Sequence, residues 1–277
     1  MPKGLQVVTF CNLCMNRTND LPSRYSKGGY AVRALATFVV LLVIWQSLSS
    51  FGNLPVFILP SPRDIVSAFG RMIFEGQFWT NTLTSIGRIA LGFLLSVTVS
   101  LPLGILLGTK RSIEAYVDPF ISFIRYIPPS AFVPLSILWF GIGEGQKVFV
   151  VFISIAPYLL LLVAEAVIHV RKEYVEAAYT LGASKSDTYW KVIIPASLPA
   201  IWEAMRLMVG AAWTFIVIVE IVAAQSGLGY SIIQAQRFLQ TANVITIIIV
   251  IGLLGLVTDI LFRVASRIWF PWVERIR

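Results

Sequence analysis

The sequence predicts an all-α, polytopic membrane protein with six transmembrane helices. Hydrophobic residues make up 57% of the 277 residues and charged residues only 13%, and the mean hydropathy is +0.80. A soluble domain usually carries about 25% charged residues, so this chain has too little charge to cover a surface that faces water. The sequence also contains six long apolar runs, and basic residues flank them. Together these observations indicate a chain whose solvent is the bilayer.

Each predicted span is an apolar run near the length of about 20 residues that a helix needs to cross a bilayer. The runs are Ala31–Leu48, Ser85–Gly108, Pro119–Gly141, Val148–Ile168, near Leu198 to near Ala224, and Val244–Phe262. Pro102 interrupts the second run late. Arg125 lies early in the third run, just before Pro128 and Pro129.

A cytoplasmic tail over residues 1–30 precedes one predicted membrane domain over residues 31–277. The tail contains both cysteines, Cys11 and Cys14, in a Cys-x-x-Cys spacing that zinc sites and redox sites also use. Zinc needs about four ligands, and the single histidine, His169, is far away in the sequence. We therefore expect a disordered tail with two thiols and no metal site.

Lysine and arginine in the short connections predict the orientation of the spans, because these residues are enriched on the cytoplasmic side. Most of them, including Lys110 and Arg111, fall on the side that also receives both termini. The other side receives only Arg63, Arg71, Lys147 and Arg237, with Arg88 near an edge. Both termini are therefore predicted to be cytoplasmic. The net charge of +8 does not indicate nucleic-acid binding, because the basic residues flank apolar runs and form no stripe with interleaved aromatic residues.

Two segments on the predicted outer side have helical patterns. The first begins at Ser61, has a capping-box-like spacing to Asp64, and is predicted to lie on the membrane surface. Its predicted apolar face comprises Ile65, Val66, Phe69, Met72 and Ile73. The second begins at Ser226 and joins a Gly227-Leu228-Gly229 hinge to another helical pattern. A mobile lid or re-entrant piece and a packed external loop are both compatible with this composition.

A polar stretch over about residues 171–199 separates the fourth and fifth apolar runs. Residues 173–181 favour a short helix, and Gly182 can adopt the positive φ that ends it. Ser184 followed by Asp187 has the spacing of a capping box, which begins a second short helix. Two prolines, Pro195 and Pro199, are expected to end that helix before the next span. The stretch therefore predicts a helix-turn-helix hairpin that projects into the cytoplasm.

This stretch resembles the EAA loop of ABC importer permeases in the spacing of its residues. The matching positions are Glu176, Ala177, Ala178, Gly182, Val192, Ile194 and Pro195. Val192 and Ile194 are conservative departures from the isoleucine and leucine that are more usual there. Longer stretches, among them LPSPRDI and ILWFGIGEGQK, are similar to the taurine, aliphatic sulfonate and nitrate branch of these permeases. The resemblance covers nearly the whole chain beyond residue 30.

The resemblance implies a type I ABC importer permease fold in a bacterial inner membrane, in contact with lipid. It implies a homodimer of permeases, two cytoplasmic ATPase subunits that bind ATP and Mg, and an extracytoplasmic solute-binding protein. The polar hairpin would then be the coupling helix that docks on the ATPase. The implied cargo is a small anionic solute. An aliphatic sulfonate or taurine is favoured, and nitrate, bicarbonate, cyanate or a thiamine precursor are the alternatives.

The sequence contains no catalytic arrangement of its own. It has no Gly-x-x-x-x-Gly-Lys-Ser/Thr loop to hold ATP phosphates, and its single histidine has no nucleophile with which to form a catalytic pair. The chain is therefore predicted to be a transport subunit without a cofactor, and ATP hydrolysis is assigned to a partner. The alternatives are an ion-coupled secondary transporter and a membrane enzyme. The first of these predicts inverted repeats and midplane ion ligands, which the sequence does not show, and the second lacks a catalytic cluster.

Ionisable residues inside a span are costly in a bilayer and are therefore functional candidates. Arg125 is a candidate for attracting an anion in the translocation path. The alternative for Arg125 is a structural role, in which it pairs with a carboxylate or extends to the cytoplasmic interface.

Glu220 lies late in the fifth span, just before the hinge, and is a gate candidate together with Gly227 and Gly229. The alternative for Glu220 is an interhelical hydrogen bond that holds the fifth span in place. Asp259 precedes Arg263 by about one helical turn and is predicted to form an ion pair with it.

Overall fold

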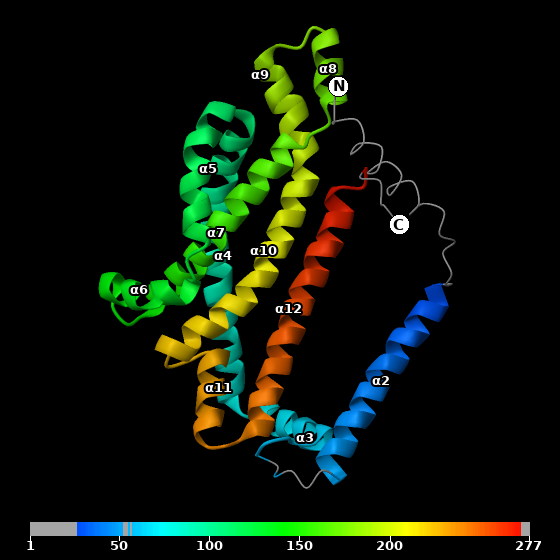
Figure 1. Ribbon diagram of the computed structural model, residues 1–277, viewed down its shortest axis with the longest axis vertical. Helices are drawn as coiled ribbons and strands as arrows, with labels where there is room; N and C mark the ends of the chain where they lie inside the picture. The colour runs from blue at the N-terminus through cyan, green and yellow to red at the C-terminus, as the bar shows by residue number, and fades with distance from the viewer. Residues whose placement is uncertain (1–26, 52–54, 56, 273–277) are drawn as a thin grey trace, which may run out of the picture. The chain divides into compact units, whose positions relative to one another are not determined.

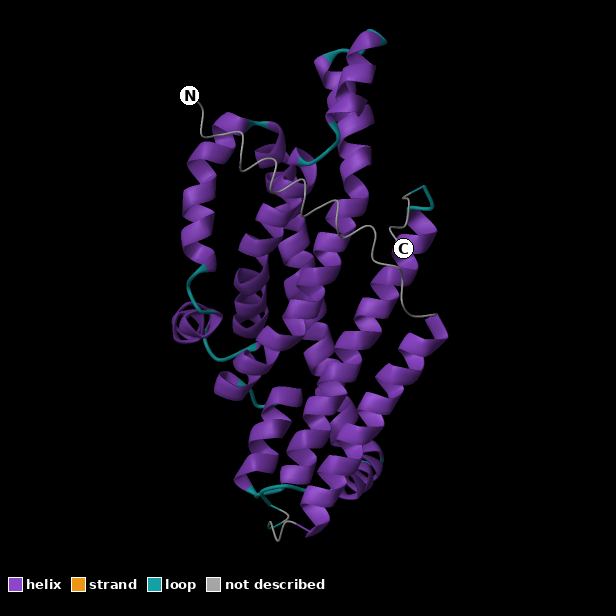
Figure 2. Ribbon diagram, turned by 45° about the vertical axis from the view of Figure 1, so that its right-hand side comes forward, coloured by secondary structure: helices purple, strands orange, loops and turns teal. Residues whose placement is uncertain are grey.

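The computed structural model describes residues 27–51, 55 and 57–272, and all regular structure among them is helical (Figure 2). The tail residues Cys11 and Cys14 lie outside the described residues. The chain divides into two compact units, Met1–Pro62 and Arg63–Arg277.

The first unit contains one described helix, α2 (Lys27–Phe51). This helix contains the predicted first span and begins before it. Its apolar part, Ala36–Ser50, is shorter than the window that a membrane span requires. The segment after α2 folds back along its end, because Trp45 Nε1 donates to the Pro60 carbonyl at 3.1 Å and Ser49 Oγ donates to the Leu59 carbonyl at 3.2 Å.

The second unit contains the remaining helices, which are labelled in Figure 1. In chain order they are α3 (Pro62–Ile73), α4 (Gly76–Thr109), α5 (Arg111–Arg125), η1 (Pro129–Ala131), α6 (Phe132–Phe140), α7 (Glu144–Ile168), α8 (Lys172–Thr180), α9 (Lys185–Thr188), η2 (Tyr189–Ile193), α10 (Ile194–Ala223), α11 (Leu228–Arg237) and α12 (Thr241–Trp269).

Four helices among the described residues are long and apolar enough to cross a membrane: Gly76–Thr109, Glu144–Ile168, Lys185–Val222 and Thr241–Trp269. A fifth crossing is available only if the bent pair Ser112–Arg125 and Pro129–Phe140 counts as one span.

The third predicted span, Pro119–Gly141, is wrong as a single helix. The chain bends by 80° between α5 and the helical segment that starts at Pro129. Pro128 and Pro129 have no N–H to donate, and a residue before proline avoids the helical conformation, so the helix ends before this pair.

The prolines at the start of the fifth span do not end the preceding helix, contrary to the sequence prediction. Helical structure runs without a break from α9 through η2 into α10. The η2 segment is a π turn in which Ile194 N–H donates to the Tyr189 carbonyl, five residues earlier. This wider turn, followed by Pro195 in the first turn of α10, accommodates the missing donor of that proline. Pro102 likewise lies inside α4 without interrupting it.

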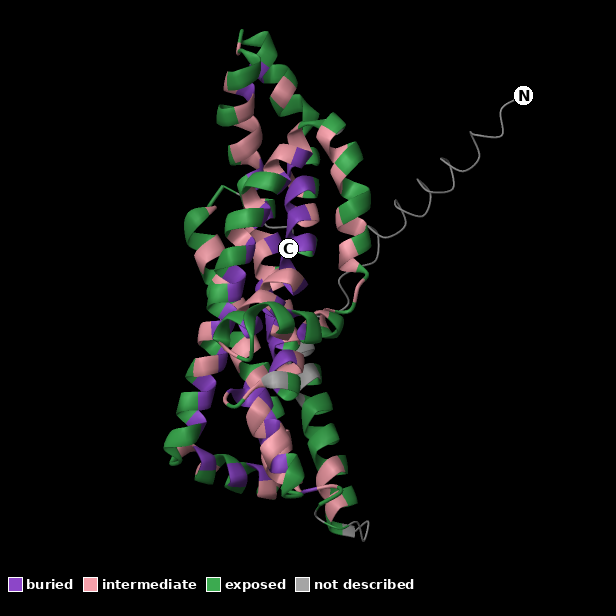
Figure 3. Cartoon of the chain, turned by 90° about the vertical axis from the view of Figure 1, so that its left-hand side faces the viewer, coloured by how far each residue is buried: buried purple, intermediate pink, exposed green. Residues whose placement is uncertain are grey.

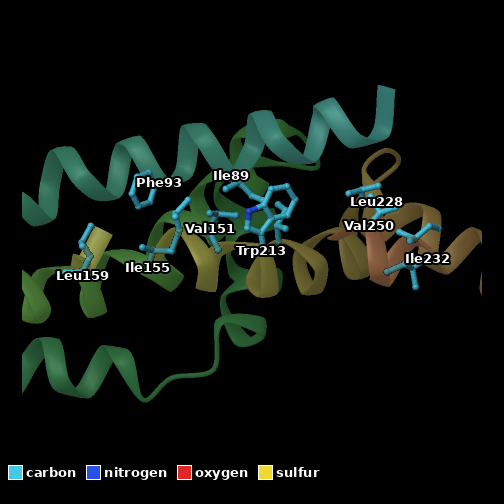
Figure 4. Packing of buried hydrophobic residues seen from close by; sticks show 14 of the residues in the cluster. Ile89, Phe93, Val151, Ile155, Leu159, Trp213, Leu228, Ile232 and Val250 are labelled. Atoms are coloured by element: carbon cyan, nitrogen blue, oxygen red, sulfur yellow. The ribbon is translucent and has the colours of Figure 1, made fainter. Parts of the chain in front are cut away.

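The core of the second unit lies where α4, α7 and α10 meet. Figure 4 shows Ile89 and Phe93 of α4 against Val151 and Ile155 of α7, with Trp213 of α10 beside them. The most apolar window of α7 is 56% buried and that of α12 only 17%, so α7 is central and α12 is peripheral. The outward faces are mostly green in Figure 3 and include many large apolar side chains, as expected for helices that contact lipid.

α3 packs against the rest of the second unit through one narrow face. Ile65, Ala68 and Met72 are buried, whereas Val66 is 71% exposed and Phe69 is also exposed. The buried residues follow the i, i+3, i+7 spacing of one narrow helical face, to which Val66 does not belong.

Glycine allows α4 and α7 to approach closely. A Cβ at Gly104 would lie 2.7 Å from both the Leu160 carbonyl oxygen and Val163 Cβ of α7. No atom outside α4 lies within 4 Å of the corresponding position at Gly87. The two glycines therefore form a matched pair in one helix.

We predict that Gly104→Ala destabilises the protein, whereas Gly87→Ala leaves it unchanged or slightly more stable. The extra methyl at position 104 forces the two helices apart, at a cost of about 1–3 kcal/mol. Alanine in place of an open helical glycine gains about 0.5–1 kcal/mol. The measurement is the temperature at which half of the detergent-solubilised protein stays monodisperse. Equal midpoints for both variants would contradict the close packing of α4 on α7.

Candidate functional site

The α8–α9 hairpin (residues 172–188) lies at one end of the second unit, and α3 and α11 lie at the opposite end (Figure 1). The hairpin is closed by local hydrogen bonds. Gly182 has a φ of +82°, Gly182 N–H donates to the Tyr179 carbonyl, and Ala183 N–H donates to the Ala178 carbonyl, both at 3.0 Å. This is the glycine-dependent helix end that the sequence predicts.

The start of α9 is also confirmed. Ser184 Oγ accepts from Asp187 N–H at 3.1 Å and donates to Asp187 Oδ2 at 2.6 Å, which is a reciprocal cap. At the start of α8, the pKa of Glu173 is lowered by a hydrogen bond from its own backbone N–H and by the charge of Arg171. An ionised carboxylate in the first turn favours the helix.

The residues of the EAA-like motif differ in exposure. Glu176, Ala177 and Gly182 are exposed, whereas Ala178 is buried. Along the following helix Val192 and Ile194 are half-buried and Pro195 is exposed.

A cavity of about 820 Å³ separates the hairpin from the ends of α4 and α7. Glu176 and Tyr179 line it from the hairpin side, and Thr109 and Val167 line it from the membrane helices. The hairpin joins α7 through residues 169–171 and joins α10 through the continuous helix that begins at Lys185.

Arg125 is the last residue of α5 and lies at the break before Pro128. Its Nη2 donates to the Tyr126 hydroxyl at 3.3 Å, and its guanidinium carbon lies 5.1 Å from the centroid of that ring. Its Nε is buried and has no hydrogen-bond partner. None of the carboxylates in the described part of the chain forms an ion pair with it.

Glu220 forms the interhelical bonds that the sequence analysis gave as the alternative to a gate. It is 1% exposed. Ser85 Oγ donates to its carboxylate at 2.8 Å, Arg88 Nη1 at 2.7 Å and Gly229 N–H at 2.8 Å. The Ser85 and Arg88 bonds join α10 to α4.

The segment of Gly227, Leu228 and Gly229 covers the turn before α11 and the start of α11, and it packs against α4. Gly227 N–H donates to Asn81 Oδ1 at 3.0 Å and Leu228 N–H donates to Ser85 Oγ at 2.9 Å. Leu228 is 1% exposed and lies beside Val250 and Ile232 in Figure 4. Gly227 has a φ of +108°, and a Cβ at this position would overlap the Glu220 carboxylate.

Arg88 is the functional candidate that the sequence analysis missed, because it was placed near an edge of its span. It is 2% exposed and all five of its N–H donors are used. They donate to Glu144 Oε2 and Oε1 (both 2.6 Å), Glu220 Oε1 (2.7 Å), the Ser226 carbonyl (2.7 Å) and Ser226 Oγ (2.8 Å). We call Arg88, Glu144, Lys147 and Glu220 the buried charge cluster, in which Arg88, Lys147 and Glu220 are buried and the Glu144 side chain is 59% exposed.

Lys147, which the sequence analysis counted among the charges of the connections, lies in the first turn of α7. Its side chain is 6% exposed and its Nζ lies 2.9 Å from Glu144 Oε1. The available signal was a single arginine in an apolar run with a serine one turn before it. The partners of Arg88 are 56 and 132 residues away, and no local spacing could identify them.

A second ion-pair group joins α10 to α12. Arg263 Nη2 lies 2.6 Å from Asp259 Oδ2, which confirms the predicted pair. Arg206 Nε lies 3.3 Å from Asp259 Oδ1. Among the described residues, no group of three or more His, Cys, Asp or Glu side chains could hold a metal ion.

Comparisons with known proteins agree with this architecture. Residues 100–269 match the family model described as binding-protein-dependent transport system inner membrane component. The taurine transport system permease protein of Escherichia coli is 30% identical over 86% of this chain and 89% of its own length. A Bacillus subtilis protein named as an aliphatic sulfonates transport permease is 34% identical over 87% of each chain. The bicarbonate transport system permease protein of Synechococcus elongatus is 32% identical over 81% of this chain and 84% of its own length.

The fold is similar to a solved ABC importer. A chain of the MetNI methionine ABC transporter in an inward-facing conformation superposes with a TM-score of 0.62 at 18% identity, over 70% of this chain and 97% of that chain. At this identity the similarity shows a shared fold and carries no argument about function.

The matched family fixes the class of protein. Its members are multi-pass components of the inner membrane, and they work with a solute-binding protein and a separate ATPase subunit. Such a permease is not itself catalytic. The chain therefore belongs to the family of binding-protein-dependent transport system inner membrane components, the permeases of ABC importers.

Proposed function

We propose that the chain forms the translocation path of a bacterial ATP-driven importer for a small oxyanion, with an aliphatic sulfonate or taurine as the favoured cargo. The relatives named for taurine, aliphatic sulfonates and bicarbonate all support a solute that carries an oxyanion group. Nitrate, cyanate and a thiamine precursor remain the alternatives to these cargoes. The permease would act as a homodimer with two ATPase subunits and an extracytoplasmic binding protein.

The proposed topology has six spans and both termini in the cytoplasm. It counts α2 and the bent α5–α6 pair as one span each, in addition to the four long helices. It places the α8–α9 hairpin in the cytoplasm and α3 and α11 outside. Support comes from Lys110, Arg111, Arg171 and Lys172, which all lie in connections at the hairpin end.

The single observation that carries the proposed function is the projecting hairpin with the spaced motif. Glu176 and Ala177 are exposed on it and are available to a partner surface. Ala178 is buried, so its small size supports packing of the hairpin. The helix from Lys185 to Val222 is continuous, and it would carry a movement of the ATPase subunit into the membrane.

Arg125 is the proposed anion-attracting residue. It lies at the break in the α5–α6 pair, and its Nε has no hydrogen-bond partner. A guanidinium with a free donor can bind an oxyanion through charge-assisted hydrogen bonds. The gate role of Glu220, Gly227 and Gly229 has less support, because their polar groups already bond within the unit.

We predict that Gly182→Val and Glu176→Lys prevent docking of the ATPase or its coupling to uptake, while insertion of the permease in the membrane is retained. A β-branched residue at a φ of +82° costs roughly 1–2 kcal/mol, and lysine reverses the charge on the exposed face of the hairpin. The measurement is co-purification of the ATPase, together with hydrolysis stimulated by the loaded binding protein. Gly182→Asn is the matched control, since asparagine tolerates the left-handed conformation. Normal docking, stimulation and uptake in both variants would remove the main support for the coupling role.

We predict that Arg125→Gln lowers uptake by about tenfold, the size expected when one charge-assisted hydrogen bond is lost. Uptake of radiolabelled taurine by cells expressing the complete importer would be compared with the amount of assembled complex. Arg125→Lys, which keeps the charge, should retain more uptake than Arg125→Gln. Unchanged uptake in Arg125→Gln would make Arg125 a structural residue.

We predict that a membrane-impermeant thiol reagent labels Ser67→Cys and Gln240→Cys from outside intact cells but does not label Ser186→Cys. All three positions are exposed, so only the side of the membrane decides the result. The background lacks Cys11 and Cys14. External labelling of Ser186→Cys would overturn the proposed topology.

A further inference from the structure

The buried charge cluster joins three separate parts of the chain to α4. Glu144 is the first residue of α7 and directly follows the turn from α6. Glu220 lies in the last turn of α10, and Ser226 lies in the turn between α10 and α11. All three bond to the one guanidinium of Arg88.

The charges of the cluster are paired, and every donor of its guanidinium is used. Arg88 has no donor left for a further ligand, and its charge and that of Lys147 are balanced by Glu144 and Glu220. Removal of one partner from such a group leaves a buried charge uncompensated, which costs much more than the net worth of the pair. The joined segments are therefore expected to move as one body.

One member of the cluster belongs to the helix that begins in the hairpin. Helical structure continues from Lys185 to Val222, and Glu220 lies within it. The π turn at η2 changes the spacing of the hydrogen bonds but does not break the helix. A displacement of the hairpin therefore reaches Glu220 without an intervening loop.

The α6–α7 turn is the segment on which this displacement would act. It carries Ile142, which is 73% exposed, and it follows a helix whose Leu138 and Trp139 are also exposed. Gln146 Nε2 of α7 donates to Ser136 Oγ of α6 at 3.1 Å. The bonds from Arg88 to Glu144 hold the start of α7, directly after the turn, against α4.

We propose that Arg88 is a positioning residue for transport, because it transmits displacement of α10 to the α6–α7 turn. This proposal rests on the proposed function in one respect, since it takes the hairpin as the contact for the ATPase. Arg88 acts through Glu144 and Glu220 and does not bind the cargo.

The test measures a conformational response that does not depend on the identity of the cargo. The permease–ATPase complex carries an Ile142→Cys probe and lacks Cys11 and Cys14. The rate at which a maleimide labels the probe is measured with and without ATP and vanadate. We expect the nucleotide to change this rate by about fivefold or more, the size of a typical coupling between two sites.

Arg88→Lys should abolish the nucleotide response, while the ATPase still co-purifies with the permease. Lysine keeps the positive charge but cannot form the forked bonds to Glu144 together with the bonds to Glu220 and Ser226. Arg71→Lys, the same change at an exposed position of α3, is the matched control and should leave the response intact.

Glu144→Gln decides the question if Arg88→Lys fails to fold, because the Glu144 side chain is 59% exposed. This variant should assemble normally and show a reduced response. A full response in Glu144→Gln or in a folded Arg88→Lys would overturn the proposal, as would the absence of a response in the parent complex. If the parent permease binds no ATPase, the proposed function fails first, and Gly182→Val would then behave like the parent.

Discussion

Arg88 places a full positive charge inside a helix that is long and apolar enough to cross a bilayer. A charge in that position is costly unless it is paired and its hydrogen bonds are satisfied. Here the two cations and two carboxylates of the cluster balance, and every donor of the guanidinium has an acceptor. These hydrogen bonds form only when α4, α7, α10 and the turn before α11 hold fixed positions along one another. The close packing of α4 on α7 through Gly92, Gly104 and Gly108 fits the same register, because each glycine lies opposite a valine of α7.

Proline has opposite effects in different helices of this protein, and the local hydrogen bonds explain the difference. Pro102 and Pro157 each lie inside a long helix and remove one donor, and neither breaks its helix. Pro128 and Pro129 remove two adjacent donors next to an exposed helix end, and the chain bends there. The bend leaves Arg125 at the end of α5, where the Tyr158 hydroxyl donates to its backbone carbonyl at 2.7 Å. A candidate binding residue is therefore held at the bend by a contact from the central helix.

The features that sequence predicts well here are those that depend on near neighbours. The positive φ at Gly182, the cap of Ser184 with Asp187 and the pair of Asp259 with Arg263 each involve residues within about one turn, so spacing alone identifies them. The apolar runs gave the long helices but not their ends, because α4 and α12 extend through polar flanks at both ends. The buried charge cluster could not be predicted, since its members are polar residues at the ends of different spans. Counting Lys147 as a loop charge followed from the same limitation, because charge statistics do not show which lysine is buried.

The hairpin and the buried charge cluster differ in how tightly their surroundings are packed, and one helix joins them. The cluster needs rigid surroundings, and Glu220 is buried among fixed donors. The hairpin has space beside it, because a cavity of about 820 Å³ lies between it and the ends of α4 and α7. A continuous helix from Lys185 to Val222 joins the two, and its membrane part is packed in the core from Ile201 to Ile216. A small displacement of the hairpin would then move the segments that bond to Arg88. A flexible loop between the hairpin and the span would instead absorb the displacement.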